Sequence, residues 1–499
     1  HLMYQDRDFV PRPDPGYFGR QLIQDLGLTV LLDTMADGDE HILSVCTCAF
    51  FQGLSSPDEI LYRQAVLRDC MEHSDVVRSM YQITCETIEE RRRHYWDWGT
   101  RYFYVSSIMS NAVRLLEYLI RQFARLKEIA GSGLPSLRSE GMKNLFTTLV
   151  LELSDEYLEE LNEHLRELSF RDGTLVSAAL TPGCVSKNYL MHQSSLTREE
   201  KIRWKFAPKY TVPPRDERGM QELARRRDIA INTAANGVAQ AADQALGYFQ
   251  ALRTELAFYT GCLNLRDALG KKGEPICFPK PRPAGEAVHA WKNLYDAGLS
   301  LILKEHVVGN TADTGTRTLT VITGANQGGK STFLRSIGQA QIMMECGMFV
   351  PAETFTSAIA KGIFTHYKRE EDAAMKSGKL DEELERMSAI VNHLHPGSLV
   401  LFNESFASTN EREGSMIARQ IVNALADAGV RIFFVTHMYD LSSGLFEQYG
   451  NRALFLRADR GSDAQRPFTL SEAGPLPTSY GEDLYEKIFS GDVENDTDV

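Results

Sequence analysis

The sequence lacks the long apolar segments that would place it in a membrane. No uncharged apolar run approaches the roughly 18 to 20 residues that a membrane-spanning helix requires. The start of the chain carries no basic segment followed by an apolar stretch, so no secretory signal is expected. His1 and Leu2 precede Met3 and are not counted in the predicted fold. We therefore expect no membrane partner.

The sequence also lacks a basic excess, since its formal net charge is −13, from 54 Lys and Arg against 67 Asp and Glu. Phosphate contacts supply most of the non-specific affinity of nucleic-acid-binding proteins, so these proteins usually carry a basic surface. The acidic balance argues against a protein that coats nucleic acid over its whole surface. It does not exclude DNA binding, because a local basic stripe would suffice.

Cysteine is scarce and scattered. Of the eight cysteines only Cys46 and Cys48 are close in the sequence, and a C-x-C pair without a second pair of ligands is poor evidence for zinc. The arrangement predicts reduced and mostly buried thiols. Such thiols favour a cytoplasmic protein.

The sequence is long, and its predicted secondary structure changes near residue 280. A chain of 499 residues is too long for one compact core, so two or three domains are expected. Its 43% apolar and 24% charged residues are ordinary for a globular protein. The pattern is mainly helical before residue 280. Strands and helices alternate after the proline-rich stretch Pro279–Pro283.

The first part of the chain predicts helices too long for one compact core. Apolar residues recur at three- and four-residue steps from Tyr104 to Ala130 and again from Met142 to Leu168, and a third helical pattern runs from Gly219 to Leu269. We expect an extended antiparallel arm. Turn signals frame two predicted strands, Thr174–Leu180 and Val185–Met191, which would form a small β element at the tip of this arm.

The second part predicts an α/β domain with a largely parallel sheet, because short apolar strands alternate with helices. Predicted helices begin near Lys330, Asp381 and Arg412. The acidic stretch Gly491–Val499 predicts a disordered tail. The predicted strands are Leu319–Thr323, Ile363–Tyr367, Leu399–Phe402, Ile432–Thr436 and Ala453–Leu456.

A phosphate-binding loop lies between the first of these strands and the following helix. Gly324 and Gly329 are spaced as in the pattern G-x-x-x-x-G-K-S. The glycines let backbone N–H groups face the phosphates, and the helix N-terminus adds partial positive charge. Lys330 would reach the β- and γ-phosphates, and the hydroxyl of Ser331 would ligate Mg²⁺. The sequence therefore predicts an ATP site.

Polar residues follow two other predicted strands. Asn403 and Glu404 come directly after an apolar strand, where Glu404 is placed to act as general base or to position the attacking water. Asn403 stands where an aspartate would hold Mg²⁺ through its water shell. Since asparagine brings no charge, we expect weaker Mg²⁺ binding and slow hydrolysis. His437 ends the next strand, which predicts a contact with the γ-phosphate.

These residues resemble the MutS family of DNA mismatch-repair ATPases. The family's loop reads G-P-N-M-G-G-K-S-T, and this chain has Gly-Ala-Asn-Gln-Gly-Gly-Lys-Ser-Thr from Gly324 to Thr332. Asn326 and the pair Gly328 and Gly329 are the discriminating matches. The resemblance covers residues 280 to 490. It continues in five segments: Gly347–Ala352, Ile363–Thr365, Phe406–Gly414, Val435–His437 and Ser479–Gly481.

The resemblance is fainter upstream, where Leu54–Gln64 is similar to a segment of the family's core domain. It implies an all-α core and lever region followed by a P-loop NTPase domain of the MutS and ABC type. The expected domains are a helical core (3–100), a lever arm with a β tip near 170–195, ending at residue 278, an ATPase domain (279–490) and the tail (491–499). We expect a short member without the family's mismatch-reading and connector domains.

The resemblance also implies site residues and a dimer. The nucleotide would contact Gly324, Asn326, Gly328, Gly329, Lys330, Ser331 and Thr332, and Asn310 aligns with a residue on the adenine side. Catalysis would fall to Lys330, Glu404 and His437, and Mg²⁺ would be held by Ser331 and, indirectly, by Asn403. Because the family's sites are completed by the partner subunit, we expect an ATP-promoted homodimer.

Departures from the family pattern leave alternatives open. Gln327 replaces the loop methionine, and Asn403 replaces the family's metal-organising aspartate. The family's signature segment, supplied in trans, corresponds to Ser377–Leu384, which keeps Glu383 but loses the phenylalanine. This segment either presents a helix N-terminus to the partner's γ-phosphate, with Glu383 acting in trans, or is only a solvated, charged helix start.

DNA contacts are expected at the arm tip rather than at the basic clusters. Lys187 and Tyr189 lie in the predicted β element, where a clamp would touch backbone phosphates. No base-reading constellation is present, so binding would be directed by DNA structure. Two functions stay open: a MutS-type ATPase acting on duplex or branched DNA, and a nucleotide-gated switch acting on RNA, a ribosome or a protein. The clusters, all with acidic neighbours, are Arg91–His94, Arg225–Arg227, Lys271–Lys272 and Lys280–Arg282.

Overall fold

The computed structural model describes residues 1–12, 14–94, 105–133, 136–170, 175–192, 211–324, 328–369, 378–459 and 467–477. By internal contacts the chain divides into two units. We call His1–Leu2 with Glu72–Leu256 the helical unit, and Met3–Met71 with Ala257–Val499 the sheet unit. The expected domain boundaries after residues 100 and 278 differ from this division and stay predictions. Among the described residues, no helix combines the length and apolarity needed to cross a membrane.

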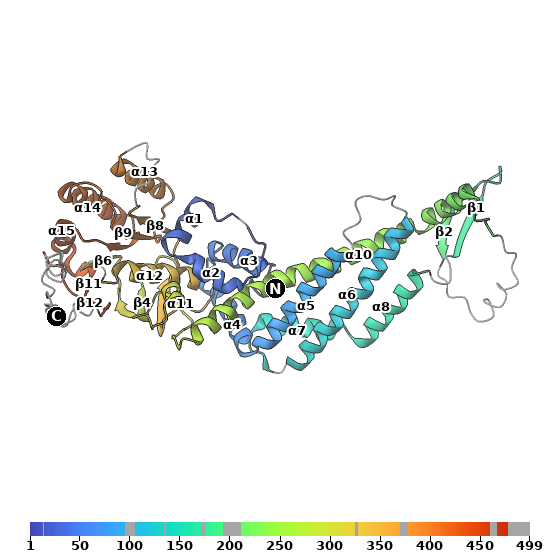
Figure 1. The fold of residues 1–499 in the computed structure, drawn as a ribbon, viewed down its shortest axis with the longest axis horizontal. Coiled ribbons are helices and arrows are strands. Elements are labelled where there is room, and N and C mark those ends of the chain that lie inside the picture. The colour runs from blue at the N-terminus through green and yellow to red at the C-terminus, as the bar shows by residue number, and fades with distance from the viewer. Residues whose placement is uncertain are drawn as a thin grey trace, which may run out of the picture. The chain divides into compact units, whose positions relative to one another are not determined.

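The sheet unit contains a six-stranded sheet in the order β12-β11-β6-β10-β9-β8 (Figure 1). All neighbouring pairs are parallel except β11 and β12. The largely parallel sheet expected from the alternation of strands and helices is therefore confirmed. The strands are β6 (Leu319–Thr323), β8 (Ile363–Tyr367), β9 (Leu399–Asn403), β10 (Arg431–Val435), β11 (Ala453–Ala458) and β12 (Leu470–Glu472).

The central strands are apolar along their length because both faces of the sheet are covered. One face packs on α14 (Glu411–Asp427), where Val422 joins Phe402 and Phe434 in one apolar core cluster. The other face packs on α12 (Lys330–Glu345), most of whose residues are buried. Helices α13 (Lys379–Val391) and α15 (Tyr439–Tyr449) complete the layer beside α14, and their residues join the same core. This packing brings the ends of β6, β9 and β10 to one edge.

A second, four-stranded sheet in the order β3-β7-β4-β5 was not predicted. Its strands are short, and two of them are polar at most positions, so no apolar run or alternation marks them. Trp291 of β4 pairs across the sheet with Phe355 of β7. The strands are β3 (Lys280–Arg282), β4 (His289–Leu294), β5 (Asn310–Asp313) and β7 (Thr354–Ala358).

The N-terminal helices of the sheet unit are fixed to it through backbone contacts. Arg63 is fully buried, and its guanidinium donates to the carbonyl oxygens of Met3 (2.9 Å) and Cys346 (3.1 Å). Gln64 donates to Pro279 O at 3.1 Å. The segment Leu54–Gln64 thus has a positioning role inside this unit. The helices are α1 (Gly16–Asp25), α2 (Leu28–Ala36), α3 (Glu40–Phe51), α4 (Pro57–Glu72) and, within the later part of the unit, α11 (Ala297–Ile302).

The helical unit is built from α5 (Ser74–His94), α6 (Val105–Gly133), α7 (Glu140–Glu152), α8 (Asp155–Leu168) and α10 (Glu217–Gly270) up to Leu256. Val113 of α6, Leu158 of α8 and Ala235 of α10 share one apolar cluster, and Phe123 packs on Phe249. Ala112, Leu115, Leu119 and Leu126 of α6, at three- and four-residue steps, are buried, so the predicted apolar periodicity marks the packed face of this helix. Figure 1 shows α6 and α10 running side by side.

One helix prediction in this unit was wrong. The periodic stretch from Met142 to Leu168 is two helices, α7 and α8, rather than one. Ser154 is the N-cap of α8, and its hydroxyl accepts a hydrogen bond from Tyr157 N at 3.2 Å. A serine cap followed by acidic residues is a helix start signal, and here it outweighs the apolar periodicity that continues across it. The predicted strands are confirmed as the antiparallel pair β1 (Leu175–Leu180) and β2 (Ser186–His192).

Candidate functional site

The predicted phosphate loop connects β6 to α12. Gly324 has a φ of +114°, and Gly329 has a φ of +84° at the N-cap of α12, a left-handed conformation that glycine adopts without strain. No side chain caps α12, so its first backbone N–H groups are open to an anion. The geometry suits a phosphate. Asn326 lies outside the described residues, as do Ala325 and Gln327.

Lys330 is the first residue of α12 and is almost completely buried. Its Nζ donates a hydrogen bond to Gly324 O at 2.8 Å, so the ammonium lies inside the loop. Burial lowers the pKa of Lys330, and the carboxylate of Glu404 opposes this shift. A phosphate anion at the loop would offset the cost of burying the ammonium.

Ser331, in the first turn of α12, and Asn403, the last residue of β9, are brought together. The Ser331 hydroxyl donates to Asn403 Oδ1 at 2.9 Å. Two uncharged oxygens thus converge where the sequence predicted a metal, and oxygen donors are what Mg²⁺ prefers. The residues fit a Mg²⁺ ion that keeps several waters and takes its charge balance from phosphates rather than from Asn403.

Glu404 follows β9 and faces His437, which follows β10. The distance between His437 Nδ1 and Glu404 Oε1 is 3.7 Å. The contact with His437 lowers the pKa of Glu404, and the charges of Lys330 and Lys368 act in the same direction. Glu404 is therefore a carboxylate at neutral pH, able to accept a hydrogen bond from water. The predicted catalytic residues Lys330, Glu404 and His437 thus lie close to one another.

Glu383 lies on α13 and is buried, with 4% of its surface exposed. Its Oε2 accepts a hydrogen bond at 2.7 Å from the backbone N–H of Phe406, two residues after Glu404. Glu383 itself is therefore not solvated, whereas Lys379 and Asp381 at the start of the same helix are exposed. The action of Glu383 on a second subunit stays a prediction. The preceding residues 370–377 lie outside the described part of the chain.

Gly328–Ser331 of the phosphate loop and Glu404 line one wall of a pocket of about 440 Å³. Its other wall comes from the segment 303–310 and from Phe468. Asn310 is part of this wall, and its side chain is engaged with the backbone, accepting from Leu470 N (2.7 Å) and donating to Phe468 O (3.3 Å). Asn310 therefore holds the segment that carries Phe468, whereas its predicted adenine-side contact stays a prediction. Thr332 also lines the pocket.

Glu274 is a pocket-supporting residue that the sequence did not indicate. It lies just after α10 and is buried. Its Oε1 accepts from Ser300 Oγ (3.2 Å) and Val307 N (3.3 Å), and lies 3.4 Å from His306 Nδ1. Glu274 thus fixes the wall that contains His306 and Val307. No motif marks it, because its role depends on a contact across more than thirty residues.

Lys187 and Tyr189 lie on β2 of the helical unit. Asn188 between them has a φ of +55°, and the pairing with β1 shifts register here, so the alternation of side chains along the strand is interrupted. Lys187 is exposed, and the hydroxyl of Tyr189 is hydrogen-bonded to Ser186 Oγ. The nearby basic cluster is engaged locally: Arg226 donates to Glu222 at 2.9 Å, and Arg227 donates to Ser106 Oγ at 2.8 Å. These pairs support a solvated helix face for the cluster on α10.

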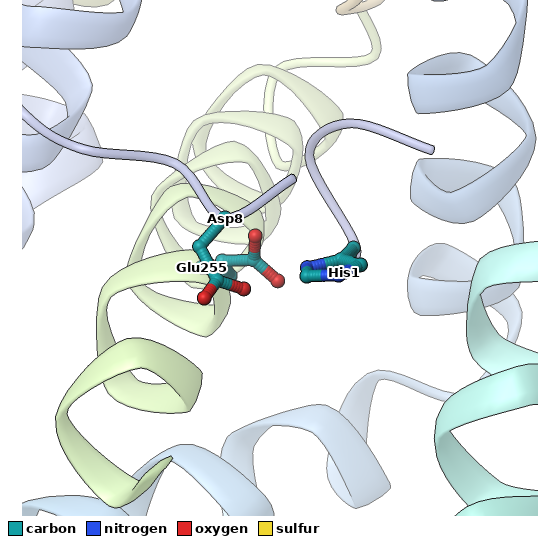
Figure 2. A group of neighbouring side chains, drawn as sticks. All are labelled: His1, Asp8 and Glu255. Atoms are coloured by element: carbon teal, nitrogen blue, oxygen red, sulfur yellow. The ribbon is translucent and has the colours of Figure 1, made fainter. Parts of the chain in front are cut away.

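Figure 2 shows a further group of possible metal-ligating side chains, His1, Asp8 and Glu255. Asp8 belongs to the sheet unit, whereas His1 and Glu255 belong to the helical unit. The group therefore forms no site within either unit, and we assign no metal to it.

Comparison with known proteins identifies relatives in both parts of the chain. A family model described as the MutS2 N-terminal domain matches residues 55–272, and one described as MutS domain V matches residues 320–482. The DNA mismatch repair protein MutS of Leptospira interrogans is 32% identical over 171 residues, which cover 32% of this chain and 20% of that protein.

Two further relatives match this chain over segments of comparable length. The DNA mismatch repair protein MutS of Thermotoga neapolitana is 32% identical over 166 residues, 33% of this chain and 20% of that protein. Human MutS protein homolog 4 is 33% identical over 135 residues, 27% of this chain and 14% of that protein. The matched part of the chain thus spans a fifth or less of these relatives.

Proposed function

Because this chain belongs to the MutS family, we propose that it is an ATPase whose nucleotide state controls its action on DNA. The sheet unit would carry a P-loop NTPase site, and the helical unit would contact duplex or branched DNA without reading its sequence. The protein would act as a homodimer in a process related to mismatch repair. The observation that carries the proposal is that Lys330 and Glu404 line one pocket at the phosphate loop, with His437 beside Glu404.

The proposed mechanism assigns each polar residue a task. The N–H groups at the start of α12 and the ammonium of Lys330 bind the phosphates of ATP. Ser331 and Asn403 would hold Mg²⁺, which supplies positive charge to the phosphate oxygens. Glu404, ionised beside His437, accepts a hydrogen bond from the water that attacks the γ-phosphate. His437 contacts Glu404 and would face the γ-phosphate.

The uncharged Asn403 makes slow hydrolysis part of the proposal. An aspartate at this position would add a negative charge close to the metal and strengthen its binding. Here only the amide oxygen of Asn403 is available, and it already accepts from Ser331. We therefore expect tight nucleotide binding together with a low rate of turnover.

The helical unit supports a second candidate function, a nucleotide-gated switch that acts on RNA, a ribosome or a protein. The observation that favours it is the pairing of basic residues with acidic neighbours, as for Arg226 with Glu222 and Arg93 with Glu89. Paired cations offer less to a phosphate backbone. Lys187 and the exposed face of β2 favour DNA, as does the family.

A gel-shift panel tests the proposal and separates the two functions. The probes are homoduplex, mismatched and branched DNA and a structured RNA, each at two stated salt concentrations, with and without ATP. We expect binding to duplex or branched DNA that weakens with salt and changes with ATP. Binding to RNA but to none of the DNA probes, with ATP hydrolysis intact, would contradict action on DNA and support the nucleotide-gated switch.

A further inference from the structure

We propose that Glu383 and His366 are positioning residues that hold the turn Glu404-Ser405-Phe406 and so aim the Glu404 carboxylate into the pocket of their own chain. The inference rests on the proposed ATP hydrolysis and adds to it the source of the geometry of the general base. It also assigns Glu383 a task in cis, in contrast to the action in trans that the family resemblance implies.

The turn needs support because its backbone is unfavourable. Glu404 has a φ of +53° and Phe406 a φ of +62°, both in the left-handed region that residues with a side chain rarely adopt. Such conformations persist only where the surroundings over-determine them. The backbone N–H of Glu404 donates to Val435 O at 2.9 Å and so ties the start of the turn to the sheet. The residues that fix Ser405 and Phe406 therefore decide where the Glu404 side chain points.

Glu383 holds the far end of the turn. Its carboxylate accepts the N–H of Phe406 at 2.7 Å, a charge-assisted contact in a buried place. On the other side of the same residue, Gly414 leaves no space: a Cβ at Gly414 would lie 2.2 Å from Phe406 O. The peptide groups of Phe406 are thus confined between α13 and α14. Loss of the carboxylate would leave a buried N–H without its acceptor.

His366 holds the middle of the turn. Its Nε2–H donates to the carbonyl oxygen of Glu383 at 2.9 Å, and its Nδ1 lies 2.8 Å from Ser405 Oγ. The imidazole also stacks on the ring of Phe406, with centroids 5.1 Å apart. Burial lowers the pKa of His366 to about 4, and nearby arginines act in the same direction. The ring is therefore neutral at physiological pH and connects α13 to Ser405 without adding charge near Glu404.

The contacts predict that loss of Glu383 lowers the rate of hydrolysis without weakening nucleotide binding. Neither Glu383 nor His366 lines the pocket, whereas Glu404 does. Removing Glu383 should displace the general base and leave the phosphate-binding groups in place. A displacement of about 1 Å at a catalytic group costs on the order of 100-fold in rate. The loss should therefore fall on kcat, with the KM for ATP and the affinity for ADP little changed.

The first experiment compares Glu383→Ala and Glu383→Gln with Glu385→Ala, a control at an exposed position of the same helix. We expect Glu383→Ala to lower kcat at least ~10-fold with KM and ADP binding within about 2-fold. Glu383→Gln keeps an oxygen that can accept from Phe406 and should recover much of the rate. ADP binding also verifies that each variant is folded. Equal kcat values for wild type and Glu383→Ala would overturn the proposal.

The second experiment distinguishes action in cis from action in trans. Glu383→Ala is mixed with Lys330→Ala under conditions in which differently tagged subunits co-purify. If Glu383 serves its own chain, neither protein contains a complete site and the mixture gains no activity. Recovered activity in the mixture would overturn the proposal, because it requires Glu383 of one subunit to complete the site of the other. If wild type hydrolyses no ATP at all, the proposed function fails instead.

Discussion

The two units of this chain hold their polar residues in different ways. In the sheet unit two charged side chains at or beside the site are buried and tied to backbone groups: Lys330 donates to Gly324 O, and Glu383 accepts from Phe406 N. In the helical unit several exposed charged residues pair with neighbours on the same helix, as in Arg226 with Glu222. Burying a charged side chain costs free energy unless its partners compensate, so buried charges such as Lys330 indicate a functional site. Exposed ion pairs are common on any protein surface and indicate no particular function.

This difference between the two units shows that the structure supports functional assignments in the sheet unit more strongly than in the helical unit. The burial of Lys330 and the left-handed backbone conformation of Glu404 are both unfavourable for folding. Both are explained if the two side chains serve the pocket. Lys187 on β2 has no such signature, and its role rests on the family alone. Substitutions in the two units test this contrast, and the largest effect is expected at the phosphate loop.

Lys330→Ala should cause the largest loss of nucleotide affinity. Truncating one partner of a buried, charge-assisted contact costs about 2 to 5 kcal/mol, which corresponds to at least ~30-fold in Kd. Equilibrium binding of labelled ATP measures it. The matched control is Lys187→Ala in the helical unit, which should bind ATP like wild type. Similar losses in both variants would contradict the contrast between the units.

His366 should make stability depend on pH. Its pKa is about 4 in the folded chain against an ordinary value of 6.5, so the unfolded chain binds more protons between these values. The contribution is present above pH 6.5 and is lost as pH falls toward 4, by about 3 kcal/mol in total. Urea unfolding of wild type and His366→Gln at several pH values measures it. The variant should lose less stability over this range, whereas the exposed His192→Gln should behave like wild type.

Asn403→Asp should strengthen Mg²⁺ dependence. The added carboxylate beside Ser331 would lower the half-saturating Mg²⁺ concentration by ~10-fold, since a charge close to the ion adds about 1 to 2 kcal/mol in a partly exposed site. ATP hydrolysis over a Mg²⁺ titration measures it. If neither the rate nor the metal affinity rises, the uncharged asparagine does not limit turnover.

Lys187→Ala should have the smallest effect and only on DNA. Loss of one phosphate contact weakens binding about 2- to 3-fold and reduces the salt dependence by about one counterion. Gel shifts of branched DNA at several salt concentrations measure both quantities. An unchanged salt dependence would remove Lys187 from the DNA-contacting surface.

Most of the site residues at the edge of the six-stranded sheet were predicted from the sequence. The glycine loop, the strand ends at Asn403 and His437, and the apolar strands are local patterns, and local patterns survive in a single sequence. The second sheet, the break at Ser154 and the support from Glu274 were missed. Each depends on pairing between distant segments, or on a cap that competes with periodicity. The buried contact of Glu383 also required the structure, because no spacing rule connects α13 with Phe406.

Single-turnover hydrolysis of bound ATP by wild type and Glu404→Gln tests the central claim most directly. The claim is that the phosphate loop and Glu404 form a hydrolytic site in the sheet unit. Loss of a general base lowers rates by about 100- to 10,000-fold. We predict that Glu404→Gln binds ATP like wild type and hydrolyses it at least ~100-fold more slowly. Hydrolysis at the same rate by both proteins would contradict the account.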